Sequence, residues 1–134
     1  MDKSVSLVAG TTPRRSTSSL GTFLNQLLNL ALTRPLNCQD LGLEDTATPE
    51  RVRSACDAFA GELAQNYLAN RITWSDADLA ANNFYELMIT RCGPRVPTYA
   101  WDVYLAFDTA ECTSPGGDAV TRPILEALQC ARDA

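Results

Sequence analysis

The decamer YAWDVYLAFD, residues 99–108, contains four aromatic residues and two aspartates. Wound at about 100° per residue, the rotation of an α-helix, it gathers apolar side chains on one side. With the residues that follow, this arc consists of Ala100, Val103, Tyr104, Phe107 and Ala110. Because one apolar arc is typical of a helix packed on a hydrophobic core, we expect a helix over residues 98–111 with this arc inside.

Trp101 and Leu105 fall outside that arc, and Asp108 lies on the same side of the helix, three residues after Leu105, at the spacing of helical neighbours. Two interpretations of these residues remain open. In the first, the helix is central in a bundle and buries Trp101 against another helix, leaving the acids at the rim. In the second, Trp101, Leu105 and Asp108 are exposed together as a binding patch, because partner-binding surfaces combine aromatic anchors with charges that select the partner.

Apolar residues recur at three- and four-residue spacing in four other stretches, which indicates further amphipathic helices. These stretches cover residues 19–33, 48–67 and 75–92 and a segment around Pro123. At the start of the third stretch, Ser75-Asp-Ala-Asp resembles a capping box with Asp78 in the acidic position. No stretch alternates apolar and polar residues between turn signals, as strands do. The sequence therefore predicts an all-α fold, a compact bundle of about five helices.

The same pattern predicts the domain boundaries. Residues 1–17 are rich in Ser and Thr and show no sustained period, so we expect a flexible N-terminal arm there. Residues 18–134 are expected to form a single helical domain, because a chain of this length supports one ordinary core. No stretch approaches the ~20 consecutive apolar residues that a membrane-spanning helix needs, so we expect no membrane contact.

Charge is divided unevenly along the chain. The formal net charge is −5, but residues 36–134 carry 7 basic against 15 acidic side chains, a balance of −8. Such a surface repels nucleic acids and anionic membranes and attracts basic molecules over a long range. A purely solubilising role for the acids remains an alternative. We therefore expect a basic protein partner and no nucleic acid.

The five cysteines include no C-x-x-C pair, so they do not have the spacing of a zinc site. An odd number of cysteines without a secretory leader favours reduced thiols in the cytoplasm, where disulfides are rare. As an alternative, Arg14-Arg15 and the apolar run of residues 20–32 could form a translocation signal, although polar side chains interrupt that run. Cys56 falls on the apolar face of its helix, so we expect it to pack rather than to act as a nucleophile.

Composition excludes several kinds of catalysis. The chain has no histidine, which rules out Ser-His-Asp and Cys-His catalysis and histidine-rich zinc sites. Its 7 glycines form neither a P-loop nor a dinucleotide-binding fingerprint. Carboxylate pairs such as Asp76/Asp78 and Asp102/Asp108 leave a metal-dependent carboxylate enzyme as an alternative. We predict a non-enzymatic protein without a cofactor or a metal.

The helix predicted from Ser75 has a second face like that of residues 98–111. On it, Tyr85 and Ile89 stand apart from the apolar stripe, bordered by acids. Aromatic anchors with acids on two neighbouring helices favour one shared contact surface. The acidic connector after the first helix is a second candidate contact. The predicted partner-binding residues are Asp78, Tyr85, Glu86, Ile89, Trp101, Asp102, Leu105, Asp108 and Glu111 on the helices, and Asp40, Glu44 and Asp45 on the connector.

Two stretches carry a resemblance to a known class of proteins: SACDAFAGELAQNYLANRITWSDADLAANNFYELM, residues 54–88, and TYAWDVYLAFDTAE, residues 98–111. In their general character they resemble the small, acidic, helical immunity proteins with which bacteria neutralise toxins. The resemblance implies an acidic surface that docks on a basic toxin, often a nuclease, and blocks its active site or its access to substrate. It assigns no role to an individual residue.

The sequence thus predicts a cytoplasmic, non-enzymatic binding protein of bacterial origin, an immunity or inhibitor protein for a basic toxin. The alternative from another class is a self-associating structural or regulatory subunit. Such a homodimer could form through the same helical faces or through the first helix, whose apolar positions could contact a second copy.

Overall fold

The computed structural model describes residues 12–113 and 116–133, with the side chains of the first helix placed from residue 22 onward. It contains α1 (Thr12–Ala31), α2 (Pro49–Leu68), α3 (Trp74–Arg91), α4 (Thr98–Glu111) and α5 (Asp118–Asp133). No strand occurs in the described residues, and the helices pack on one another. The predicted all-α bundle of about five helices is confirmed. In the same part of the chain, no helix combines the length and the hydrophobicity that crossing a bilayer requires.

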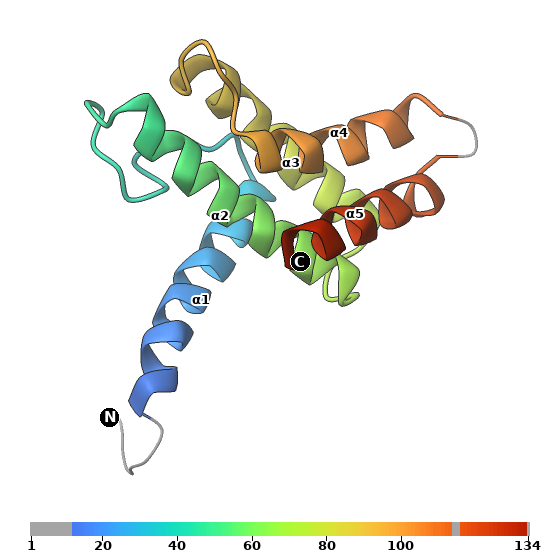
Figure 1. Ribbon diagram of the computed structural model, residues 1–134, viewed down its shortest axis with the longest axis horizontal. Coiled ribbons are helices and arrows are strands. Elements are labelled where there is room, and N and C mark those ends of the chain that lie inside the picture. The colour runs from blue at the N-terminus through green and yellow to red at the C-terminus, as the bar shows by residue number, and fades with distance from the viewer. Residues whose placement is uncertain (1–11, 114–115, 134) are drawn as a thin grey trace.

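Helix α1 begins at Thr12, earlier than the start near residue 19 that the periodicity predicts. Residues 12–17, expected in the arm, are therefore helical, and residues 1–11 lie outside the described part of the chain. Figure 1 shows that the N-terminal half of α1 extends away from the other helices. A helix can continue beyond its packed turns because, once nucleated, each added residue gains a hydrogen bond. Near its C-terminal end, Leu27, Leu28 and Ala31 are buried in the core.

Two helices begin with a threonine cap. At α2, Thr48 Oγ1 accepts a hydrogen bond from the backbone N–H of Arg51 at 3.2 Å, and Pro49 is the first helical residue, so the helix begins where the predicted stretch of residues 48–67 does. At α3, the cap is Thr73, whose Oγ1 accepts from the N–H of Asp76 at 3.1 Å. The predicted capping box starting at Ser75 is therefore wrong. Asp78 lies in the second turn of α3 instead, next to acidic side chains of α4.

The start of α4 is capped by a residue of another helix. Its N-cap residue is Pro97, whose side chain makes no capping hydrogen bond. Asp57 on α2 supplies the missing acceptor: its Oδ1 accepts from the backbone N–H of Ala100 at 2.9 Å. A carboxylate at this end also opposes the positive end of the helix dipole. Helix α2 therefore fixes the start of α4 by a polar contact as well as by packing.

Aromatic rings fill the centre, where α2, α3 and α4 meet. The ring centroids of Phe59 and Phe84 lie 4.8 Å apart, and those of Tyr67 and Phe107 lie 5.4 Å apart. All of these rings are buried. Because burial of large apolar side chains is the main driving force for folding, this cluster determines how the three helices sit against one another.

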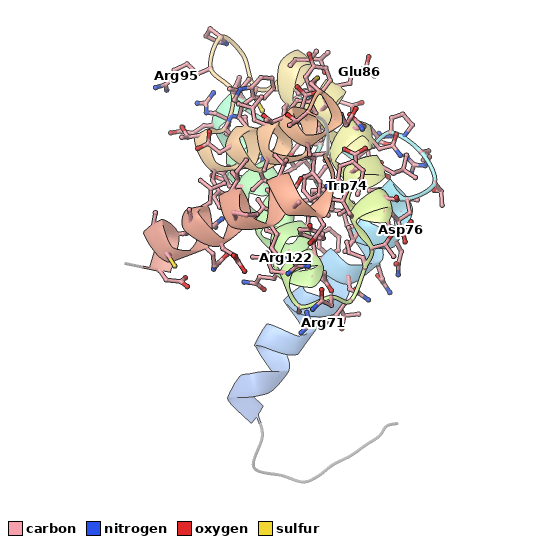
Figure 2. The ribbon with its side chains drawn as sticks, turned by 90° about the vertical axis from the view of Figure 1, so that its right-hand side faces the viewer. Arg71, Trp74, Asp76, Glu86, Arg95 and Arg122 are labelled. Carbon is pink, nitrogen blue, oxygen red and sulfur yellow. The ribbon has the colours of Figure 1, made fainter. Side chains whose placement is uncertain are left out.

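Helix α5 is joined to α3 and α4 by a buried hydroxyl group. Trp74 Nε1 donates to Thr121 Oγ1 at 2.8 Å, and Thr121 Oγ1 donates to the carbonyl oxygen of Ala106 at 2.8 Å. Thr121 is 0% exposed, and its bond to Ala106 is shielded from water. Trp74, labelled in Figure 2, is partly buried against the core. Arg122 adds a cation–π contact, with its guanidinium carbon 4.8 Å from the centroid of the Tyr67 ring.

The turn between α4 and α5 requires glycine. The two helices lie side by side as a hairpin in Figure 1. Gly116 packs directly against the carbonyl group of Ala110, and a Cβ atom at residue 116 would collide with it. Gly117 has a φ of +71°, in the left-handed region that glycine adopts without strain.

Replacing Thr121 with Val tests the buried hydroxyl. The substitution keeps the shape but leaves the Trp74 indole N–H without its acceptor, which should lower the free energy of unfolding by about 1–3 kcal/mol. Urea denaturation monitored by Trp fluorescence measures this, with Thr109→Val on the exposed side of α4 as the matched control. Equal stability of the two variants would contradict the role assigned to Thr121.

Candidate partner-binding surface on helices α3 and α4

Three aromatic side chains form a continuous row across α3 and α4. Tyr85 on α3 stacks on Tyr104 of α4 with ring centroids 4.7 Å apart, and it lies 5.9 Å from Trp101. Trp101 and Tyr104 are 5.3 Å apart on α4 itself. All three side chains are half-buried, so the row packs on the bundle and also reaches the solvent. We call Tyr85, Trp101 and Tyr104 the aromatic row.

The placement of Tyr104 differs from the prediction. The helical arc assigned it to the core, whereas in the structure it is half-buried and Ala106 is buried instead. The reason is that α4 makes an extensive contact with α5, which turns the buried side of α4 towards α5 and leaves Tyr104 at the border with α3. Two features of the sequence could have indicated this half-buried position. Tyr104 lies at the edge of the predicted arc, and its hydroxyl group needs a polar neighbour.

Two exposed aliphatic side chains belong to the same two helices. Ile89, one turn after Tyr85 on α3, is 45% exposed, and Leu105, one turn after Trp101 on α4, is 36% exposed. Large aliphatic side chains with this exposure contribute apolar area that a partner can bury. Four of the predicted contact residues, Tyr85, Ile89, Trp101 and Leu105, are therefore all accessible on α3 and α4.

Three carboxyl groups gather at one end of the aromatic row. Asp78 of α3 lies beside Glu111 and Asp108 of α4. The side-chain amide of Asn82 donates to Glu111 Oε2 at 3.2 Å, and the hydroxyl of Tyr104 contacts Asp108 Oδ1 at 3.5 Å. The predicted acids Asp78, Asp108 and Glu111 are thus brought together, and we call them the acid cluster.

The acid cluster perturbs the groups around it. Burial, hydrogen bonding with Glu111 and repulsion by Glu111 and Asp108 raise the pKa of the Asp78 carboxyl to about 7. Asp78 Oδ1 is buried and has no hydrogen-bond partner in the described residues. Burial and the negative charge of Asp108 likewise raise the pKa of Tyr104 to about 12. Among the described residues, no arginine or lysine forms an ion pair with Asp78, Asp108 or Glu111.

The acids of the connector between α1 and α2 are in a different electrostatic state. Arg34 forms a bidentate pair with Asp40, at 2.7 and 2.8 Å, which holds the pKa of the Asp40 carboxyl below its usual value. Glu44 pairs with Arg51 at 2.9 Å. These two predicted contact residues therefore have cationic partners within the chain. For Asp45, the third, the structure places its backbone carbonyl within 2.6 Å of an Arg91 guanidinium nitrogen.

The two remaining predicted residues are not part of the acid cluster. Asp102 lines a shallow cavity of about 430 Å³ between α4 and α5, together with Leu128 and Arg132, so it faces away from the aromatic row. Glu86 is exposed on α3 and projects outward in Figure 2. The structure therefore does not bring Asp102 together with the other acids of α4.

Other reactive groups are either buried or scattered. Cys56 is buried in the core, as predicted, and burial raises the pKa of its thiol far above the usual value. A thiol in this state does not supply the thiolate that a nucleophile needs. Among the described residues, no three or more Cys, Asp and Glu side chains are arranged to hold a metal ion.

The comparisons with known proteins yield no relative. No protein-family model matches the chain, and no curated protein and no solved structure matches it significantly. The surface on α3 and α4 is therefore interpreted from its own geometry and charge.

Replacing Asp78 with Asn tests the electrostatic state of the acid cluster. An acid whose pKa is raised on folding stabilises the fold below its unfolded pKa and loses that contribution as the pH rises through its folded pKa. We expect Asp78→Asn to change stability little near pH 4 and to increase it by about 1–2 kcal/mol near pH 8, a figure reduced for partial exposure to water.

Urea denaturation at both pH values measures the effect. Asp76→Asn is the matched control, because Asp76 is exposed in the first turn of α3. Its negative charge interacts favourably with the positive end of the helix dipole, so its removal should slightly destabilise the protein. A destabilised Asp78→Asn variant near pH 8 would contradict the assignment.

Proposed function

We propose that the protein is a non-enzymatic binding protein that covers a basic protein partner with the surface formed by α3 and α4. The observation that carries the proposal is the composition of this surface. It combines the aromatic row with exposed Ile89, it borders the α4–α5 groove at exposed Leu105, and it ends in carboxyl groups that have no cationic partner within the described residues.

Each part of the surface supplies a different contribution to binding. Half-buried aromatic rings are preorganised, so a partner that covers them gains apolar contact at a small entropic cost. Carboxylates attract a basic partner, raise the association rate and disfavour acidic competitors. The connector acids Asp40 and Glu44 contribute less, because arginines of the same chain already neutralise them.

The partner that this surface fits best is a basic toxin, and the protein then acts as a bacterial immunity or inhibitor protein in the cytoplasm. A toxin that acts on nucleic acid needs a positively charged substrate-binding surface. An acidic protein seated on that surface competes for the same charges and prevents the substrate from entering. Inhibition of this kind requires no catalytic group, in keeping with a surface that presents aromatic rings and carboxyl groups.

Affinity capture from a lysate of the native organism, with washes at low and then high salt, tests the proposal. We expect one basic protein to be retained at low salt and released or weakened by salt, because screening reduces attraction between exposed charges. Recovery of the bait alone would contradict neutralisation and favour self-association. The groove between α4 and α5, lined by Leu105, Ile124 and Leu128, is the surface that a second copy could then use.

Substitutions on and off the α3–α4 surface test whether the partner binds there. Trp101→Ala should weaken binding of the captured partner by more than about 2 kcal/mol, roughly thirtyfold, because it removes a central aromatic anchor. Asp108→Asn should reduce mainly the association rate and its salt dependence. Phe23→Ala and Glu126→Gln are matched controls, an exposed aromatic on α1 and an exposed acid on α5. If Phe23→Ala weakens binding as much as Trp101→Ala, the α3–α4 surface is not the contact.

A further inference from the structure

Asp78 and Glu111 form a carboxyl pair that joins α3 to α4 at the end of the aromatic row. Asn82 donates to Glu111, and Asp78 Oδ1 is buried without a donor in the described residues. A buried carboxylate oxygen without a hydrogen bond is costly. A proton held by Asp78 lowers both costs, because it neutralises the buried carboxylate and cancels one of two adjacent negative charges.

The groups that face this pair add negative charge or none. From α4 these are Tyr104 and Asp108, in addition to Glu111 itself. From α3 the group is Asn82. No arginine or lysine of the described chain pairs with Asp78, Asp108 or Glu111, so no internal cation substitutes for the proton.

The neighbouring aromatic row is suited to a cation from another molecule. Elsewhere in this chain, two arginines form cation–π contacts with aromatic rings. The guanidinium carbon of Arg122 lies 4.8 Å from the ring centroid of Tyr67, and that of Arg132 lies 3.8 Å from the ring centroid of Tyr99. No such contact to the aromatic row is found in the described residues. Partly exposed rings beside carboxylates give a guanidinium both a π-face and an anionic partner.

We propose that binding at the α3–α4 surface is linked to a proton: Asp78 holds a proton beside Glu111 in the free protein, and an arginine of the partner that binds over the aromatic row displaces it. This inference rests on the proposed function and adds its regulation. It makes the affinity of the surface for a basic partner depend on pH in the neutral range.

The direction and size of the effect follow from linkage. A cation binds the ionised pair more tightly than the protonated pair, so affinity rises with pH until the proton is fully lost. Because the pKa of Asp78 is raised to about 7, we expect the affinity to increase about tenfold between about pH 6 and about pH 8. Arginine keeps its charge throughout this range, so the released proton comes from the protein.

Calorimetric titration with a tetra-arginine peptide with blocked termini, at low salt and in buffers of different ionisation enthalpy, tests the linkage. We expect tighter binding near pH 8 than near pH 6, with proton release to the buffer at the lower pH. Asp78→Asn should abolish both the pH dependence and the proton release, whereas Glu126→Gln on α5 should keep both. A ¹³C NMR titration of the free protein should show the carboxyl of Asp78 changing state near neutral pH.

The outcomes separate the two proposals. Salt-sensitive binding with equal affinity at both pH values would overturn the proton linkage and leave the binding surface intact. Titration of all carboxyl groups at ordinary acidic pH in the free protein would overturn the linkage as well. Absence of binding at either pH would overturn the linkage together with the basic-partner function.

Discussion

The hydroxyl group of Thr121 is the contact on which the arrangement of the C-terminal half depends. It accepts a hydrogen bond from Trp74 of α3 and donates one to the backbone of α4, inside an otherwise apolar interior. Three helices therefore meet at one polar atom, and a polar atom in the core requires this geometry because an unpaired one is costly. With α5 held here, one side of α4 is buried, and Trp101 and Tyr104 are left at the border with α3.

The surface on that border departs from what stability alone would favour. Three carboxyl groups approach each other at the end of the aromatic row without an arginine in the described residues, while Asp40, Glu44 and Asp118 each have one. Proteins commonly retain unfavourable local interactions where they serve function. An internal arginine would stabilise the cluster and would also occupy the place of a partner's cation.

The fold class was predictable because each helix shows its own apolar period, and the caps at Thr48-Pro49 and the turn at Gly116-Gly117 are local in sequence. Contacts between helices were not predictable in the same way. Asp57 caps α4 from α2, and Trp74 is hydrogen-bonded to Thr121 of α5, so neither the start of α3 nor the orientation of α4 follows from local sequence.

The candidate surface was predictable in part for the same reason. Tyr85, Trp101, Asp78, Asp108 and Glu111 were identified from their place outside the apolar stripes, and the structure brings them together on α3 and α4. Tyr104 was assigned to the core, and Asp102 was grouped with acids from which the contact with α5 separates it. Pairing of the connector acids with Arg34 and Arg51 depends on loop geometry, which periodicity does not encode.

Hydrogen–deuterium exchange on the complex with the captured partner is the most direct measurement of where binding occurs. Peptides that cover the second half of α3 and the whole of α4 should gain protection on binding, and peptides from α1 and the connector should exchange as in the free protein. Protection confined to α1, to the connector or to the outer face of α5 would contradict the assignment of the binding surface to α3 and α4.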